Sequence, residues 1–282
     1  MDGARALALS VLGIIGAVWA GYVALLWFLQ DRIVFPAPGG IDRASLDQAA
    51  GELGARALDL EASDGTPLYA WHRSVGADRL AIYLPGNGET VAENTGLHRL
   101  LLNEGWDVLA LAYRGYPGSG GHPGEEGVVL DALAAWDWAV AQGGYTPDRI
   151  VVHGRSLGGG VAAHLVEQKN PAGVVLESTF VSARALARRM APLAPVDLMF
   201  RHPFDTIERA PRFGVPALVM HSTSDQVIPV ELGGRGLLPY LAEATYVEVE
   251  GVSHAQCLPV ADRELRDAYI SFLEEVVPRE AS

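Results

Sequence analysis

From residue 56 onward the sequence alternates between short strand-like runs and longer helix-like runs. The first two strand-like runs, ALDLEAS (57–63) and PLYAWHR (67–73), flank the turn signal SDGT and predict an antiparallel hairpin. Further strands are predicted at 79–85, 106–113, 148–154, 172–179, 216–222 and 245–251, and helices at 90–105, 128–142, 161–168 and 231–241, with a last helix ending near Val277. This order predicts one α/β domain built on a mostly parallel sheet with helices on both faces.

The N-terminal segment is of a different kind. No charged residue lies between Arg5 and Asp31. At about 1.5 Å per residue, positions 6–30 can cross a hydrocarbon core of about 30 Å. Trp27 stands near the end of this run, where aromatic side chains are frequent at membrane surfaces. We therefore predict an uncleaved, single-pass membrane anchor.

A cleaved signal peptide is the alternative. Val18 and Ala20 fit a cleavage site, but the apolar run continues well beyond Ala20 and only one arginine precedes it. The side of the membrane stays open. Arg32 and Arg43 outnumber Arg5 and favour a cytoplasmic domain, whereas a short N-terminal tail is typical of the opposite orientation.

The chain divides into three parts on this basis. Residues 1–30 form the anchor, residues 31–54 a linker that leads into the domain, and residues 55–282 the α/β domain. The linker contains FPAPGG (35–40), whose prolines and glycines predict a short, stiff connection. Residues 181–215 hold four prolines, interrupt the alternation and predict a short lid insertion with one or two helices.

Composition excludes some classes of function. The formal net charge of −13 argues against nucleic acid, whose phosphates require lysine and arginine. Cys257 is the only cysteine, so an intramolecular disulfide and a cysteine-based metal site are both excluded. With 49% hydrophobic residues, the chain has the composition of an ordered globular protein.

Two glycine-rich loops invite a nucleotide-binding interpretation, and neither fits it. In GRSLGGG, starting at Gly154, the positions that a phosphate-binding loop gives to Lys and Ser/Thr are held by Gly160 and Val161. In LPGNGETV (84–91), Val91 occupies the place of the third glycine of a dinucleotide fingerprint. We therefore expect no bound nucleotide.

The same residues fit a nucleophile elbow. Gly154, Ser156 and Gly158 match G-x-S-x-G between a predicted strand and a predicted helix, which is the context this motif requires. A sharp strand–turn–helix connection forces strain on the serine and leaves no room for side chains two residues away. The N–H of Leu157, at the helix N-terminus, then faces developing negative charge and is predicted to be an oxyanion donor.

A serine nucleophile needs a base and a group that orients the base. In this arrangement the acid and then the histidine follow the serine in the chain. Asp225 and His254 each follow a predicted strand, which places them at the carboxyl edge of the sheet. The rival acids Asp197 and Asp205 lie in the proline-rich insertion. Most other histidines precede Ser156, lie in the helix after it or lie in the insertion; His221, inside a strand, is expected to be core.

The second oxyanion donor is expected from the loop after the third strand. This loop is PGNG (85–88), and we assign the backbone N–H of Asn87, with flanking glycines that permit close approach. The alternative is an ordinary turn.

The motifs LPGNGE, YRGYPGSGGHPGEEG, HGRSLGGG, ESTF, HSTSDQVIP and GVSH together resemble the α/β-hydrolase superfamily over about residues 55–278. Within it the chain is most similar to the serine-aminopeptidase-like branch and to single-pass membrane α/β-hydrolase-domain proteins. The resemblance implies an eight-stranded sheet, the triad Ser156, Asp225 and His254, and no cofactor or metal. Ser222 and Val252 depart from the family, which often has glycine at these places.

These observations predict a membrane-anchored serine hydrolase that cleaves esters or thioesters through an acyl-enzyme. The substrate classes are a lipid, an acylated protein or an acylated small molecule. A peptidase on the same scaffold is the alternative enzyme, and a non-catalytic, membrane-anchored binding module is the alternative outside enzymes.

Overall fold

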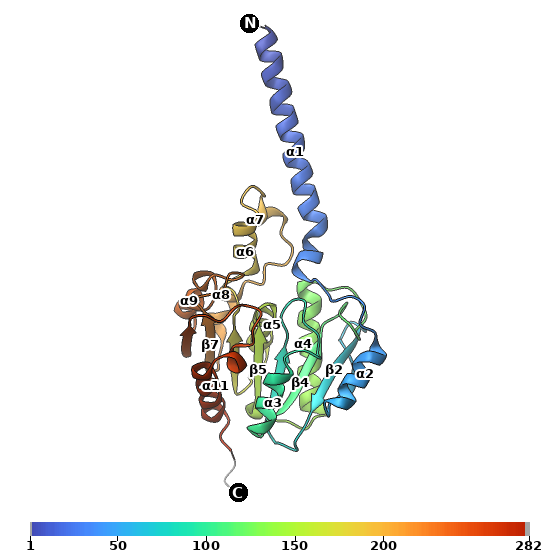
Figure 1. Cartoon of the computed structure of the whole chain (residues 1–282), viewed down its shortest axis with the longest axis vertical. Coiled ribbons are helices and arrows are strands. Elements are labelled where there is room, and N and C mark those ends of the chain that lie inside the picture. Colours follow the sequence, from blue (N-terminus) through green and yellow to red (C-terminus); the bar gives the residue numbers. More distant parts are fainter. Residues whose placement is uncertain (1, 280–282) are drawn as a thin grey trace.

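The computed structural model describes residues 2–279. A long N-terminal helix, α1 (Asp2–Val34), projects away from an α/β body, and the described part of the chain ends on the opposite side of that body (Figure 1). The predicted anchor lies inside α1. Among residues 2–279, α1 holds the one helix long and apolar enough to cross a membrane, and a signal sequence near the N-terminus would pass the same test.

The body is built on one eight-stranded sheet in the order β1-β2-β4-β3-β5-β6-β7-β8. The strands are β1 (Arg56–Glu61), β2 (Pro67–Arg73), β3 (Leu80–Leu84), β4 (Asp107–Ala112), β5 (Ile150–Arg155), β6 (Gly173–Glu177), β7 (Ala217–Ser222) and β8 (Ala244–Val249). Only β2 runs against its neighbours β1 and β4, and all other pairs are parallel. The predicted hairpin and the mostly parallel sheet are thereby confirmed.

Helices cover both faces of this sheet. They are α2 (Arg43–Glu52), α3 (Thr95–Asn103), α4 (Glu125–Ala141), α5 (Leu157–Gln168), α6 (Ala183–Met190), α7 (Val196–Met199), α8 (Thr206–Arg209), α9 (Gly234–Leu237), α10 (Leu258–Ala261) and α11 (Arg263–Val276), with 3-10 turns at Pro147–Arg149, Ala210–Arg212, Val230–Leu232 and Leu238–Tyr240. The insertion contains three short α-helices and one 3-10 turn instead of the one or two helices expected.

Three predicted segments differ in detail. The helix expected over 90–105 begins only at Thr95, because Asn94 adopts a left-handed conformation (φ 52°) that ends the preceding turn. The helix expected over 231–241 is divided into short pieces at Gly233, where a Cβ would lie 2.3 Å from the His221 ring. The predicted linker contains a ten-residue helix, α2, which Asp42 caps by accepting a hydrogen bond from the N–H of Ser45.

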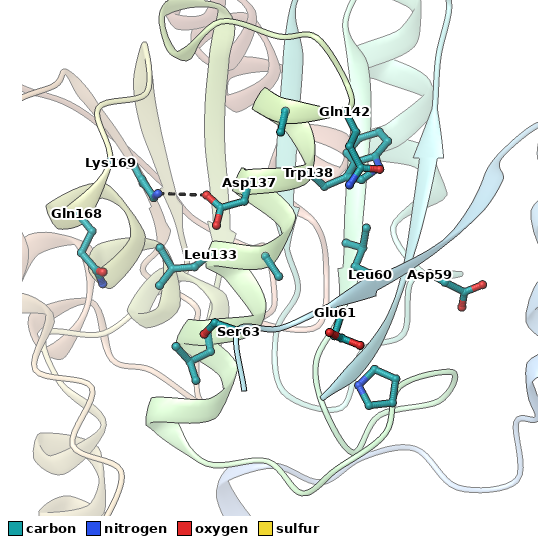
Figure 2. Close-up of a pocket in the computed structure, with 14 residues that line it drawn as sticks. Asp59, Leu60, Glu61, Ser63, Leu133, Asp137, Trp138, Gln142, Gln168 and Lys169 are labelled. Carbon is teal, nitrogen blue, oxygen red and sulfur yellow. Dashed lines mark hydrogen bonds and ion pairs between the residues drawn. The ribbon is translucent and has the colours of Figure 1, made fainter. Parts of the chain in front are cut away.

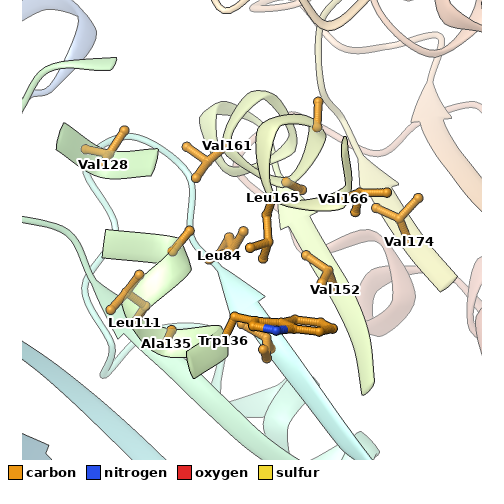
Figure 3. Packing of buried hydrophobic residues seen from close by; sticks show 14 of the residues in the cluster. Leu84, Leu111, Val128, Ala135, Trp136, Val152, Val161, Leu165, Val166 and Val174 are labelled. Carbon is orange, nitrogen blue, oxygen red and sulfur yellow. The ribbon is translucent and has the colours of Figure 1, made fainter. Parts of the chain in front are cut away.

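Alternation along the strands divides the core between the two faces of the sheet. In β3, Leu80, Ile82 and Leu84 belong to one buried cluster, and Ala81 and Tyr83 belong to the other. Figure 3 shows the first cluster, where valines and leucines of β3, β5 and α5 meet Trp136 of α4. Burial on both faces explains why the central strands are continuously apolar.

The C-terminal end of α1 is packed onto the body. Phe35 is buried in the core, and its ring lies edge-on to those of His202 and Phe204, with centroids at 5.1 and 6.2 Å. Asp31 accepts a hydrogen bond from His202 Nε2 at 2.8 Å and pairs with Arg201 at 2.7 Å. The end of α1 and the residue that follows it are therefore packed against the body, whereas the sequence had predicted only a stiff linker here.

Candidate active site

Ser156 lies on the sharp turn between β5 and α5. Its backbone has φ 51° and ψ −115°, a conformation that strains any residue with a side chain. A Cβ on Gly154 would lie 2.4 Å from the carbonyl oxygen of Gly158, and a Cβ on Gly158 would lie 2.0 Å from that of Leu84. Both positions therefore require glycine, as the sequence predicted.

A hydrogen-bonded chain connects the three predicted residues. Ser156 Oγ lies 3.0 Å from His254 Nε2, and His254 Nδ1 lies 2.6 Å from Asp225 Oδ2. The other carboxylate oxygen of Asp225 accepts hydrogen bonds from the N–H groups of Val227 and Ile228, at 2.9 and 2.8 Å. Residues separated by up to 98 positions are thus brought together at the carboxyl edge of the sheet.

Asp225 is held in its ionised form. Burial alone would raise the pKa of this carboxyl, but the hydrogen bonds from His254 and the Ile228 amide outweigh burial and leave the pKa below its ordinary value. The carboxylate therefore fixes the orientation of the imidazole, with Nδ1 toward Asp225 and Nε2 toward Ser156. The family departures at Ser222 and Val252 leave the contact between Asp225 and His254 intact.

His221 also approaches Asp225 but is occupied elsewhere. Its Nδ1 accepts a hydrogen bond from the N–H of Gly234 at 3.1 Å, so Nε2 carries the proton and donates to the carbonyl of Ile228 at 2.9 Å. Burial lowers the pKa of this imidazole. His221 is a neutral core residue, as expected.

A cavity of about 430 Å³ opens over Ser156. Ser156, His254, Asn87 and the two glycines beside Asn87 are among the residues that line it. Leu157 is the first residue of α5, so its N–H has no acceptor within the helix. The N–H of Gly86 is already bound to Glu89 at 2.9 Å. The two predicted donors, Asn87 and Leu157, thus belong to segments that meet beside Ser156.

The sequence reasoning missed a buried ionic network behind the serine. Arg155, the residue before Ser156, forms an ion pair with Glu89 of the PGNGE loop and a second one with Glu177 of β6, at 3.3 Å. Arg155 Nη2 also donates to the backbone carbonyl of His254. One guanidinium thereby joins the loop of the predicted oxyanion donor to the loop of the predicted base.

A larger cavity, of about 1010 Å³, lies elsewhere, between β1, α4 and the end of α5 (Figure 2). Ser63, Asp137 and Lys169 are among its lining residues, and Asp137 pairs with Lys169 at 3.1 Å. Histidine is absent from its lining within the described part of the chain. Across residues 2–279 no group of three or more His, Cys, Asp or Glu side chains has a geometry that could hold a metal ion.

Comparison with known proteins gives the family. The family model described as serine aminopeptidase, S33, matches residues 77–198. The α/β-hydrolase domain-containing protein WAV2 of Arabidopsis thaliana is 30% identical over 76% of this chain and 76% of its own length. The uncharacterized protein Rv2307c of Mycobacterium tuberculosis is 33% identical over 96% of both chains.

Other matches agree. The mouse lysophosphatidylserine lipase ABHD12 is 32% identical over 58% of this chain and 46% of its own. The solved Pyrococcus furiosus esterase Pf2001 has the same fold, with a TM-score of 0.65 at 18% identity over 86% of this chain and 95% of that chain. The sheet, the elbow and these relatives define a hydrolase. The chain belongs to the α/β-hydrolase superfamily.

Proposed function

We propose that the protein is a membrane-anchored serine hydrolase that cleaves carboxylic esters or thioesters. The observation that carries this proposal is the chain Ser156–His254–Asp225, with contacts of 3.0 and 2.6 Å, at a strained elbow that opens into a cavity. A structural turn would need neither the strain at Ser156 nor a buried, ionised partner behind the histidine.

In the proposed mechanism, Ser156 Oγ attacks the acyl carbonyl while His254 accepts its proton. His254 then protonates the leaving alcohol or thiol, and water hydrolyses the acyl-enzyme by the reverse sequence. The N–H groups of Asn87 and Leu157 stabilise the oxyanion, and each such donor typically contributes about 10²–10³ in rate.

The substrate class follows from the position of the domain. An anchor through α1 places the cavity near a bilayer, which favours esters or thioesters of lipids, acylated proteins or acylated small molecules. The lysophosphatidylserine lipases among the relatives support a lipid ester. A peptidase is the second candidate, favoured by the serine-aminopeptidase family model and by a similar fold in a puromycin-hydrolyzing peptidase of Mycobacterium tuberculosis.

A fluorophosphonate probe tests the proposal directly. The full chain in detergent is treated with the probe, and the labelled peptide is mapped by mass spectrometry. We expect labelling at Ser156 and none in Ser156→Ala, with circular dichroism as the check that the variant is folded. A folded wild-type protein that resists labelling contradicts an activated serine. A series of acyl esters, thioesters and aminoacyl amides then separates an esterase from a peptidase.

A further inference from the structure

The insertion carries an apolar tip that stands beside α1. This α6–α7 tip, residues 190–198, projects from the body on the same side as α1 (Figure 1). Trp19 Nε1, in the middle of α1, donates a hydrogen bond to the carbonyl of Leu193 at 2.8 Å. Gln30, near the end of α1, is bound to the base of the same segment through Met199 and Arg201.

The position of these contacts along α1 gives the depth of the tip. Trp19 and Gln30 are eleven positions apart, which is about 16 Å along a helix axis. The whole interval lies within the uncharged run 6–30. If α1 crosses a bilayer, the Leu193 carbonyl lies alongside the part of α1 that is in or at the hydrocarbon.

The side chains of the tip suit such surroundings. Met190, Leu193 and Leu198 are 74%, 74% and 89% exposed, although each is large and apolar. Isolated exposed apolar side chains are common on soluble surfaces, but three within nine residues of one projecting tip concentrate apolar area that water solvates poorly.

Most backbone N–H groups of the tip are already hydrogen-bonded within the protein. The N–H groups of Ala191, Ala194 and Val196 donate to backbone carbonyls of α6 or of the tip itself, at 2.8, 3.0 and 2.8 Å. Pro192 and Pro195 have no N–H at all. With the Leu193 carbonyl bound to Trp19, few backbone groups remain that would oppose transfer to a medium without water.

Charge is arranged to match a lipid headgroup region. Arg188 and Arg189 end α6 immediately below the apolar tip, and both are exposed. Arg188 pairs with Asp197, while Arg189 extends into solvent. On a protein of net charge −13, this places positive charge directly beside the apolar tip, and long arginine side chains can extend from there toward anionic headgroups.

We propose that the α6–α7 tip is a second membrane-contact element, which inserts Met190, Leu193 and Leu198 into the leaflet next to α1. The occupant of this surface is the lipid bilayer. The inference rests on the proposed membrane anchor and adds to it an insertion whose tip lies in the same leaflet, so that an acyl chain reaches the insertion without leaving the lipid.

Fluorescence quenching in vesicles tests the contact without relying on catalysis. The full chain is reconstituted in phosphatidylcholine vesicles containing some phosphatidylserine, with an environment-sensitive fluorophore on Leu193→Cys. Leu12→Cys, in α1, is the control for the anchor. Val75→Cys, an exposed apolar site at the opposite edge of the sheet, is the control for water, and the unaltered chain gives the background from Cys257.

We expect spin-labelled lipids to quench the probes at Leu193 and Leu12, and iodide to quench only the probe at Val75. Iodide quenching at Leu193 with lipid quenching at Leu12 overturns the inference and leaves the anchor in place. A Leu193 probe shielded from both quenchers indicates a protein partner or a second copy, and also overturns it. Iodide quenching of the probes at both Leu193 and Leu12 overturns the anchor and the inference together.

A triple variant, Met190→Ser/Leu193→Ser/Leu198→Ser, measures the consequence for activity. We expect about a tenfold lower rate on an ester embedded in vesicles, since each lost apolar contact weakens insertion, and an unchanged kcat/KM on water-soluble p-nitrophenyl acetate. Equal loss on both substrates overturns the inference in favour of a structural role, and an unchanged rate on vesicles overturns it outright. A wild-type protein inactive on both esters contradicts the proposed function, while the quenching result stands independently.

Discussion

The larger of the two cavities in this protein is not the one that holds the hydrogen-bonded serine. The one in Figure 2 is more than twice as large, about 1010 Å³ against about 430 Å³, yet its serine, Ser63, and its aspartates, Asp59 and Asp137, are all exposed. The smaller one is lined by a serine on a strained turn and by His254, which a buried, ionised aspartate holds from behind. We therefore expect the reaction at the smaller cavity, because of its hydrogen-bonded arrangement and the strain at Ser156, although its volume is the lesser of the two.

Removing the serine from each cavity gives the largest expected contrast. Ser156→Ala should lower kcat/KM by about 10⁶, by analogy with other serine nucleophiles, whereas Ser63→Ala should leave it unchanged. Ester hydrolysis by both variants at equal folded concentration is the measurement. Substantial activity in Ser156→Ala would remove the nucleophile assignment, and a comparable loss in Ser63→Ala would move the reaction to the larger cavity.

The aspartates allow a second matched pair. Asp225→Asn preserves shape but no longer fixes the productive tautomer of His254, and should cost about 10⁴ in kcat. Asp137→Asn breaks only the exposed pair with Lys169 and should change neither kcat nor folding measurably. Steady-state kinetics of the two variants test this, and equal activities would contradict the role of Asp225.

The third contrast concerns the buried ion pairs of Arg155, which lie behind the smaller cavity. The described residues that line the larger cavity include no comparable buried network. Arg155→Met leaves the Glu89 and Glu177 carboxylates without their shared cation and frees the loops that they hold. We expect a 10- to 100-fold lower kcat with fluorophosphonate labelling of Ser156 still detectable, about what a small misplacement of reacting groups costs. Partial rescue by Arg155→Lys is expected, because lysine keeps the charge but loses the fork.

That experiment needs a stability control. If the thermal midpoint of Arg155→Met falls far enough that the loss of activity tracks unfolded protein, the arginine has only a structural role. Retained stability together with unchanged kcat would show that the loops hold their positions without it.

The smallest expected effect concerns stability and separates folding from catalysis. His98 is fully buried, its ring nitrogens lack hydrogen-bond partners among the described residues, and burial, assisted by Arg73, lowers its pKa to about 3. At pH values between about 3 and the pKa of 6.5 in the unfolded chain, His98 binds a proton in the unfolded chain and stays neutral in the folded one. Stability is therefore complete above pH 6.5 and is lost as the pH falls.

From pH 7 to pH 5 this group alone should remove about 2 kcal/mol of unfolding free energy. His98→Leu should abolish that increment, as measured by urea unfolding at the two pH values. Equal pH dependence in wild type and variant would mean that His98 is hydrated or paired in the native state.

The sequence was sufficient where local patterns determine structure. The strand predicted at 79–85 is Leu80–Leu84, and the one at 245–251 is Ala244–Val249. The elbow could be predicted because strand, glycines, serine and helix are contiguous. Chain order and strand ends then singled out His254, which the structure brings into contact with Ser156, and Asp225, which contacts His254; their catalytic roles stay a prediction.

The remainder depended on contacts between distant segments. Arg155 meets Glu177 only because β5 and β6 pair in parallel with these residues in register, and it meets the His254 carbonyl across 99 positions. No pattern around Arg155 signals either contact. Helix α2 was missed because its sequence, RASLDQAAGE, has little apolar periodicity and buries only Leu46 and Ala50.

The packing of the end of α1 against the body has a geometric consequence. With Phe35 in the core and Asp31 bound to the insertion, the body cannot swing freely beneath its helix. In a bilayer crossed by α1, Ser156 would stand at a fixed height above the lipid. The protein would then select among acyl bonds by their distance from the membrane surface as well as by their chemistry.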